Sequence, residues 1–189
     1  MVECGRKIPF VVEWATRYVL QACRNCELVP PSSEGVSGPA RNIYRVPGSK
    51  TEVDSLKLVF ENVHNEASEK ALEQLLDNEG FQGGVKHTRV NSVASLLKSY
   101  FSSLPQPLIH RETQAVFVEA AGSQPWTTEK VEKIMDDHMS PDAKNCLKIL
   151  VCHLKAISQL PDAMSVQSLA TVWAPNLFHS QSPNEVTLI

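Results

Sequence analysis

The sequence lacks a basic excess, an acceptor site for N-linked glycosylation and an apolar run long enough to cross a membrane. Its formal net charge is −3, which leaves no domain-wide positive charge to neutralise nucleic-acid phosphates. No Asn-x-Ser/Thr triplet occurs, and Glu13 soon interrupts the apolar stretch near the N-terminus, unlike a signal peptide. Residues 163–184 carry no charged side chain, but their serines, amides and two prolines predict a packed segment rather than a membrane span.

The chain also lacks a cysteine pattern that would bind a metal. It has five cysteines, and Cys23 and Cys26 form a C-x-x-C pair, whereas a structural zinc site needs a second pair at comparable spacing. Cys146 and Cys152 lie six residues apart on one predicted helix, which is a poor clamp for an ion. We expect no metal or cofactor of the chain's own. Free thiols favour a reducing, cytoplasmic compartment, with any recruitment to membranes left to domains outside this chain.

Motifs of self-contained enzymes are missing as well. Lys50 and Thr51 resemble the end of a nucleotide-binding P-loop, but the two glycines that the motif requires are replaced by Ser49 and Tyr44. No G-x-S-x-G elbow occurs, and none of the six histidines adjoins an obvious nucleophile in a motif. The sequence therefore predicts no active site contained within the chain.

Apolar residues at helical spacing are abundant. A length of 189 residues with 42% hydrophobic and 21% charged residues fits a single globular domain spanning 1–189. Apolar positions recur at i, i+3, i+4 and i+7, and no convincing alternating run predicts a strand. We predict an all-α fold of about eight helices, in the segments 9–23, 51–61, 66–77, 90–105, 111–121, 127–137, 142–160 and 164–173.

Signals for helix ends and loops complete this outline. Asn91 or Ser92 is the expected N-cap of the fourth of these helices, and Pro105 its stop. Residues 27–41, with three prolines, predict a long loop, and residues 79–91 a second loop rich in glycine. The chain ends without a helix stop signal, so we expect a domain cut from a longer, multidomain protein.

Three segments together form a specific pattern. They read IYRVPG at 43–48, ASLLKSYFSSLPQPL at 94–108 and SLATVWAPNLF at 168–178. In this order and separation they resemble the RhoGAP domain, the all-helical module that activates Rho-family GTPases. The resemblance extends from about Ile8 to the C-terminal residues. It implies a bundle of about nine helices, and family domains usually continue one helix beyond the end of this chain.

The resemblance implies that Arg45 is an arginine finger, because it occupies the arginine of the I-Y-R-x-x-G motif. The transition state of GTP hydrolysis spreads negative charge over the phosphoryl oxygens, and an arginine supplied in trans accelerates the reaction roughly 10³- to 10⁵-fold. Arginine stays ionised and offers several donors in a planar fork. Ile43 and Tyr44 would anchor the loop, and Pro47-Gly48 would turn it into the next helix. The alternative is a surface arginine that caps that helix.

The resemblance further implies a face that meets the GTPase. Lys98 matches the family lysine near the finger loop, and Asn176 matches an asparagine that touches the GTPase near its switch region. Without the resemblance, Lys98 is a solvated helix-surface lysine and Asn176 an amide that caps a turn. The predicted GTPase-binding residues are Lys98, Asn176, Tyr44 and Ser102.

The chain departs from the family pattern at several positions. Ser102 replaces an arginine, which bears on affinity or GTPase preference more than on catalysis. Ser168 replaces an asparagine, Ala174 a glycine and Asn42 another glycine, although asparagine tolerates left-handed backbone angles. The loop at 27–41 and the acidic helix at 66–77 resemble insertions beside the finger loop.

Three hypotheses follow. In the first, the domain docks on a GTPase of the Rho, Rac or Cdc42 type, which carries its own GTP and Mg²⁺, and inserts Arg45 into the nucleotide site. The domain is then a GTPase activator and not an enzyme itself. In the second, a catalytically weak or inactive module of the same fold binds the GTPase as an adaptor. In the third, the chain is a helical scaffold unrelated to GTPases.

Overall fold

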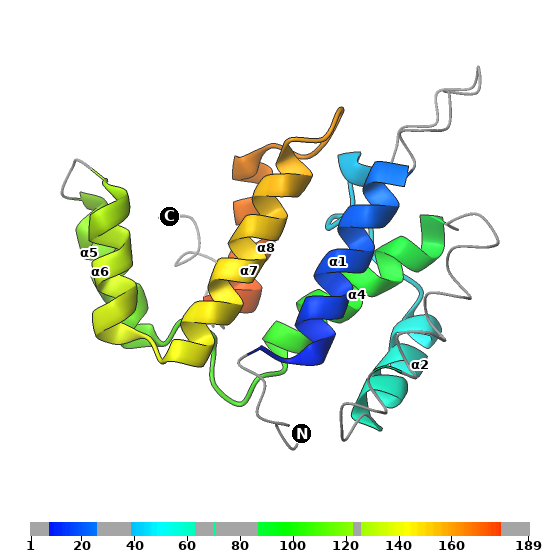
Figure 1. The fold of residues 1–189 in the computed structure, drawn as a ribbon, viewed down its shortest axis with the longest axis horizontal. Coiled ribbons are helices and arrows are strands. Elements are labelled where there is room, and N and C mark those ends of the chain that lie inside the picture. The colour runs from blue at the N-terminus through cyan, green and yellow to red at the C-terminus, as the bar shows by residue number, and fades with distance from the viewer. Residues whose placement is uncertain (1–7, 26–38, 63–69, 71–86, 123–125, 179–189) are drawn as a thin grey trace.

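A computed structural model describes residues 8–25, 39–62, 70, 87–122 and 126–178 (Figure 1). These residues form helices and no strand, so the predicted all-α class is confirmed. Seven α-helices are described, slightly fewer than the eight or nine predicted. They are α1 (Phe10–Asn25), α2 (Lys50–Glu61), α4 (His87–Ser102), α5 (Arg111–Gly122), α6 (Thr128–His138), α7 (Pro141–Ser158) and α8 (Val166–Phe178), with a 3-10 turn, η2, at Pro39–Arg41.

Several segments predicted as loop or helix lie wholly or mostly outside the described residues. These are the helix predicted at 66–77, of which only Lys70 is described, and most of the loops at 27–41 and 79–91.

Helix ends follow local capping chemistry in some places and tertiary contacts in others. Ser140 caps α7 by accepting a hydrogen bond from the backbone N–H of Ala143 at 3.2 Å. The expected N-cap of α4 at Asn91 or Ser92 is wrong, because α4 begins at His87. The predicted end of α8 near residue 173 is also wrong, since that helix continues through Pro175. Pro175 is exposed, so water can solvate the helical carbonyl group left without a donor.

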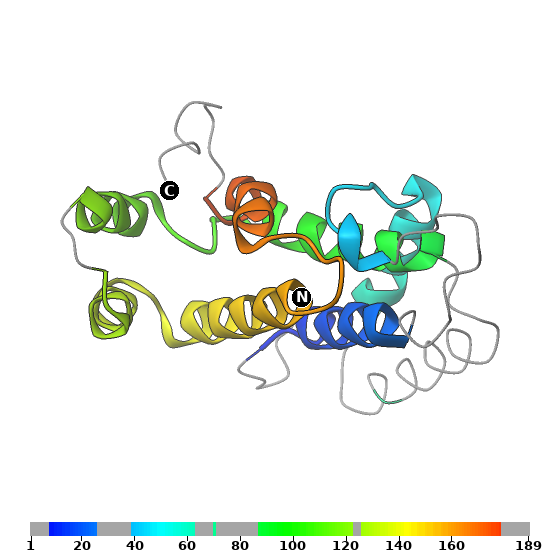
Figure 2. The same cartoon turned by 90° about the horizontal axis from the view of Figure 1, so that it is seen from above.

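The helices pack in two layers (Figure 2). One layer holds α1 and α7 side by side, and the other holds α4 and α8; α2 packs on α4, and the α5–α6 hairpin joins through α6 to α7. Large apolar side chains fill the space between the layers. The largest fully buried ones are Trp14, Trp173, Tyr44, Phe101, Ile43, Leu97, Leu150, Ile157 and Leu169.

The uncharged segment at 163–184 packs as predicted over its described part. Helix α8 buries Leu169, Trp173 and Leu177 against the core. Within the described portion of the chain, none of the helices combines the length and apolar character required to cross a bilayer.

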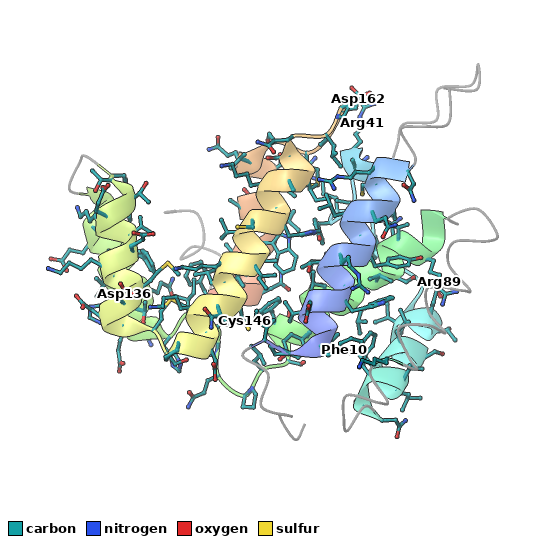
Figure 3. All side chains as sticks on the ribbon, viewed as in Figure 1. Phe10, Arg41, Arg89, Asp136, Cys146 and Asp162 are labelled. Atoms are coloured by element: carbon teal, nitrogen blue, oxygen red, sulfur yellow. The ribbon has the colours of Figure 1, made fainter. Side chains whose placement is uncertain are left out.

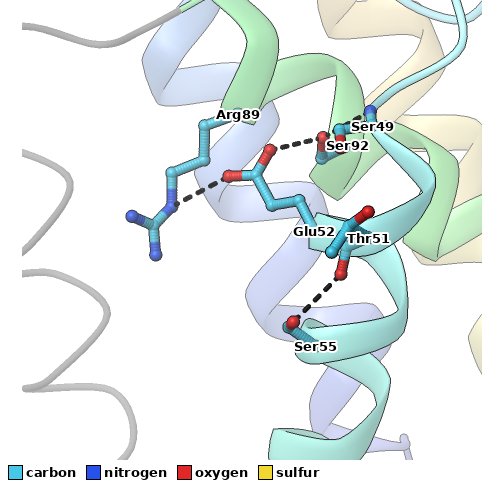
Figure 4. A network of polar contacts seen from close by, with 6 residues as sticks. All are labelled: Ser49, Thr51, Glu52, Ser55, Arg89 and Ser92. Carbon is cyan, nitrogen blue, oxygen red and sulfur yellow. Dashed lines mark hydrogen bonds and ion pairs between the residues drawn. The ribbon is translucent and has the colours of Figure 1, made fainter.

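The turn after η2 is tied to α4 by a close backbone approach. A Cβ atom added at Gly48 would lie 2.2 Å from the Cα atom of Ser92, so only glycine fits there. The Gly48 N–H donates to Ser95 Oγ at 2.9 Å, and the Ser49 N–H donates to Ser92 Oγ at 3.1 Å. Ser92 Oγ donates in turn to a carboxylate oxygen of Glu52 at 2.7 Å (Figure 4). These contacts fix the start of α2 on α4.

The connection between α7 and α8 meets η2 at one end of the molecule. The Met164 N–H donates to the carbonyl oxygen of Ala40 at 3.3 Å. The labelled side chains of Arg41 and Asp162 lie at this same end (Figure 3). Asp162 has a φ of 52°, a left-handed conformation that aspartate adopts more readily than most residues. The hydrogen bond from Met164 therefore supports η2, directly before the segment that carries Arg45.

Candidate functional site

Arg45 lies exposed on a tight turn between η2 and α2. The N–H groups of Arg45 and Val46 donate to the carbonyl oxygen of Asn42 at 2.9 and 3.0 Å. The two residues before Arg45, Ile43 and Tyr44, are each 0% exposed. The predicted anchoring of the loop by these two residues is therefore confirmed. Ile43 and Tyr44 fix the backbone of the turn in the core, whereas Arg45 is exposed to solvent.

Tyr44 is held by helices α7 and α8. Its ring meets Trp173 edge to face, with centroids 5.0 Å apart, and its hydroxyl lies 2.5 Å from Nε2 of His153. Burial raises the pKa of Tyr44 well above its usual value, and the nearby Cys23 thiol adds to this shift. Burial also lowers the pKa of His153 to about 4. Both groups are therefore neutral near pH 7, and a hydrogen bond joins the phenol to the imidazole.

The side chain of Lys98 binds the backbone of the same tyrosine. Its ammonium, on α4, donates to the carbonyl oxygen of Tyr44 at 2.7 Å. Lys98 lies off the apolar stripe of α4, but its side chain turns back onto the loop and is partly buried there. That burial lowers its pKa. The structure thus brings Arg45, Tyr44 and Lys98 together.

Ser102 and Asn176 pair with each other across the ends of α4 and α8. Ser102 Oγ lies 2.6 Å from Oδ1 of Asn176 and 2.9 Å from the carbonyl oxygen of Lys98. Because a hydroxyl has a single hydrogen, its donation is shared between these two acceptors. The Asn176 amide donates to the carbonyl oxygen of Val172 at 3.0 Å. The backbone of Lys98 thus joins this pair to the Arg45 cluster.

The Arg45 guanidinium has a surface contact on α8. Nη2 donates to Ser168 Oγ at 3.2 Å, and Ser168 Oγ lies 3.0 Å from Ser165 Oγ. Ser168 is the position where the sequence departs from the asparagine of the family pattern. This hydrogen bond is exposed, so water or a partner can replace it at little cost.

His153 is the residue at this site that sequence reasoning did not find. It lies on α7 and is only 5% exposed, on the same face as Leu150 and Ile157. A single histidine within an apolar stripe is a weak signal, because most such residues are ordinary core positions. Its partner, Tyr44, is 109 positions away in the sequence, so only the fold reveals the contact.

Comparisons with known proteins identify the family. The sequence pattern of the RhoGAP domain matches residues 38–182. The chain is 30% identical over 152 residues to a probable Rho-GTPase-activating protein 7 of Schizosaccharomyces pombe, covering 78% of this chain and 20% of that protein. It is 28% identical over 181 residues to the GTPase-activating protein rrc-1 of Caenorhabditis elegans, covering 94% of this chain and 20% of that protein.

Human Rho GTPase-activating protein 30 is also similar, at 30% identity over 148 residues, covering 76% of this chain and 12% of that protein. The chain thus spans a fifth or less of the length of these relatives.

Solved structures share the fold. Human Rho GTPase activating protein 15 superposes with a TM-score of 0.70 at 22% identity, covering 97% of this chain and 78% of that one. The BH domain from GRAF, the GTPase regulator associated with focal adhesion kinase, superposes with a TM-score of 0.63 at 17% identity, covering 94% of this chain and 86% of that one. The sequence match over residues 38–182, together with this common fold, shows that the chain belongs to the RhoGAP domain family.

Proposed function

We propose that this domain stimulates GTP hydrolysis by a Rho-family small GTPase of the Rho, Rac or Cdc42 type, with Arg45 entering the partner's nucleotide site. The observation that carries the proposal is the placement of Arg45, an exposed guanidinium directly after a residue that is 0% exposed. The relatives are named as GTPase-activating proteins, which supports the same activity for this chain. The domain is then an activator, and the hydrolysis is the partner's own reaction.

The turn that carries Arg45 is held in place before any partner docks. A finger that had to be ordered on docking would use part of its binding free energy for that ordering. Tyr44 is already fixed through its ring and its backbone, so Arg45 would enter the site with little backbone rearrangement. The exposed hydrogen bond to Ser168 would be exchanged for contacts with the phosphate oxygens.

The remaining predicted residues act in this proposal as supports and rim contacts. Lys98 supports the loop and lies partly exposed beside it. Asn176 keeps one amide N–H beyond its bond to Val172, which could donate to the switch region of the GTPase. Ser102 holds the amide oxygen of Asn176 where the family has an arginine, so we expect it to alter affinity or preference.

The partner would bring GTP and Mg²⁺, and the domain would need no cofactor of its own. Cys152, which is exposed and forms no disulfide, fits activity in the reducing cytoplasm.

A single-turnover hydrolysis assay over a panel of Rho-, Rac- and Cdc42-type GTPases tests the proposal. We expect the wild-type domain to accelerate at least one of them and Arg45→Ala to abolish most of that acceleration. Arg111→Ala, an exposed arginine at the start of α5, is the matched control and should retain it. If the wild type binds the GTP-bound GTPase without accelerating hydrolysis, and Arg45→Ala changes nothing, the domain is the adaptor instead.

A further inference from the structure

We propose that His153 is a positioning residue for Arg45, because it accepts the hydroxyl hydrogen of Tyr44 and so fixes the turn that carries the guanidinium. This inference rests on the proposed function, since it concerns how the arginine is held ready. His153 lies on α7, whereas the turn lies between η2 and α2. The contact therefore links a central helix to the proposed finger.

Tyr44 is held at two points, at its side-chain hydroxyl and at its backbone carbonyl group. At the side-chain end, the hydroxyl lies 2.5 Å from His153 Nε2, and the two rings meet at 83°. At the backbone end, Lys98 donates to the Tyr44 carbonyl group, which belongs to the same planar peptide unit as the Arg45 N–H. A change at the tip of Tyr44 is therefore carried to Arg45 through few rotatable bonds.

Hydrogen-bond counting indicates that stability alone does not explain the histidine. With Nε2 as acceptor, the ring proton is on Nδ1, which is buried and makes no hydrogen bond among the described residues. Burial lowers the pKa of His153, and the Thr16 backbone opposes this shift only in part. An unsatisfied buried donor costs about 1–3 kcal/mol. An apolar pair of similar shape would avoid this cost, so the polar pair is expected to serve position rather than stability.

The neighbourhood of Tyr44 has a second buried donor of this kind. The Trp173 indole N–H, on α8, makes no hydrogen bond within the described part of the chain, and its ring packs against Tyr44. Buried polar groups without partners are rare and often mark sites where structure is held for function. The two residues that carry these groups, His153 and Trp173, both contact Tyr44 and lie on two different helices.

The test separates positioning from stability with three single replacements and one double variant. Tyr44→Phe removes only the hydroxyl, whereas His153→Leu removes the acceptor Nε2 together with the buried Nδ1–H. The double variant Tyr44→Phe/His153→Leu replaces the polar pair by an apolar one and should recover much of the stability lost in either single variant. His153→Gln is the conservative rescue, because its amide oxygen can accept near the position of Nε2.

The first readout is single-turnover hydrolysis on the responsive GTPase, with the domain concentration varied. We expect the rate at saturation to fall about 10- to 100-fold in both single variants, as for a reacting group misplaced by about 1 Å. The concentration for half-saturation should change less than about threefold, since the docking face is intact. The double variant should regain thermal stability but not the rate, and His153→Gln should regain most of the rate. Recovery of the rate together with stability in the double variant would overturn the proposal.

The second readout needs no GTPase, and so distinguishes failure of this inference from failure of the proposed function. Backbone ¹⁵N relaxation of Arg45 should indicate a rigid turn in the wild type and greater motion in Tyr44→Phe and His153→Leu. Unchanged order at Arg45 in folded variants would refute the positioning role, whatever the activity. Loss of order in a domain that activates no GTPase would leave the positioning role in place and refute the proposed function.

Discussion

The two sides of the Arg45 turn are built differently. On the inner side, Tyr44 is fully buried and bonded to His153 and Lys98, and a glycine brings the backbone against α4. On the outer side, Arg45 makes an exposed hydrogen bond to the hydroxyl group of Ser168.

The buried contacts can therefore set the position of Arg45, whereas the exposed contacts can set the choice of partner. Breaking a buried polar contact leaves an unsatisfied group that costs about 1–3 kcal/mol, whereas an exposed hydrogen bond exchanges with water at little net cost. The buried contacts of the inner side are therefore costly enough to break that they can hold Arg45 in one place. The outer side, which includes Ser102 and Asn176, can be rearranged when a GTPase docks.

The largest effect on the inner side is expected for Gly48→Ala. Its new Cβ would overlap the Ser92 backbone, so α2 and the turn must move away from α4. We expect a loss of about 3 kcal/mol in the free energy of unfolding, measured by urea denaturation, together with a lower rate of stimulated hydrolysis. Gly122→Ala, which would meet nothing within 4 Å, is the control and should be neutral or slightly stabilising. Equal stabilities for the two variants would contradict this packing.

The next largest effect on the inner side is expected from lowering the pH, which should reduce the free energy of unfolding. His153 has a native pKa of about 4 against a usual 6.5, so the unfolded state binds the proton more strongly. Stability from this group is complete above pH 6.5 and is lost as the pH falls toward 4. Wild type should lose about 2 kcal/mol more of its unfolding free energy between pH 7 and pH 5 than His153→Gln does. Parallel pH profiles for the two proteins would show that His153 is not buried in its neutral form.

A smaller effect is expected for Lys98→Met, which removes the donor to the Tyr44 carbonyl group but keeps a long apolar stem. Hydrogen bonds from charged donors contribute about 1.5–3 kcal/mol, and partial exposure reduces this. We expect roughly a tenfold fall in the saturating rate of stimulated hydrolysis, consistent with that range. Lys155→Met, on the exposed part of α7, should have no effect. If both lysine variants behave alike, Lys98 does not support the turn.

The smallest effect belongs to the outer side. Ser102→Ala removes a hydroxyl that bonds Asn176 at the surface. The saturating rate should change by less than about threefold, because exposed hydrogen bonds contribute little. Any change should instead appear in the affinity for the GTPase, measured by titration. A large loss of rate at saturation would mean that the outer side also positions Arg45, and the distinction between the two sides would fail.

Part of this arrangement could be predicted from the sequence. Apolar periodicity located α1, α2, α5, α6 and α7, because their buried faces are long and regular. It placed the start of α4 too late, because the first turn of that helix is polar and Ser92 serves a tertiary contact, not a cap. The rule that proline ends a helix misled at Pro175, which sits on an exposed face.

The candidate site was predictable to the extent that its residues are local in sequence. The motif around Arg45 and the segment with Lys98 were identified through their resemblance to the RhoGAP family, which short local motifs carry. The bond between Tyr44 and His153 was not, since it joins residues 109 positions apart and needs the packing of α7 beneath the turn. The pairing of Ser102 with Asn176 likewise depends on how α4 meets α8.

The most direct test of the account is the rate of GTP hydrolysis at saturating domain, compared between wild type and Arg45→Ala, with the affinity of each for the GTP-bound GTPase measured in parallel. We expect a fall of roughly 10³-fold or more in the stimulated rate. Affinity should fall far less, because the rim and the inner side remain intact. A variant that binds as well as wild type and keeps a tenth or more of the acceleration would contradict the claim that Arg45 is the group supplied to the transition state.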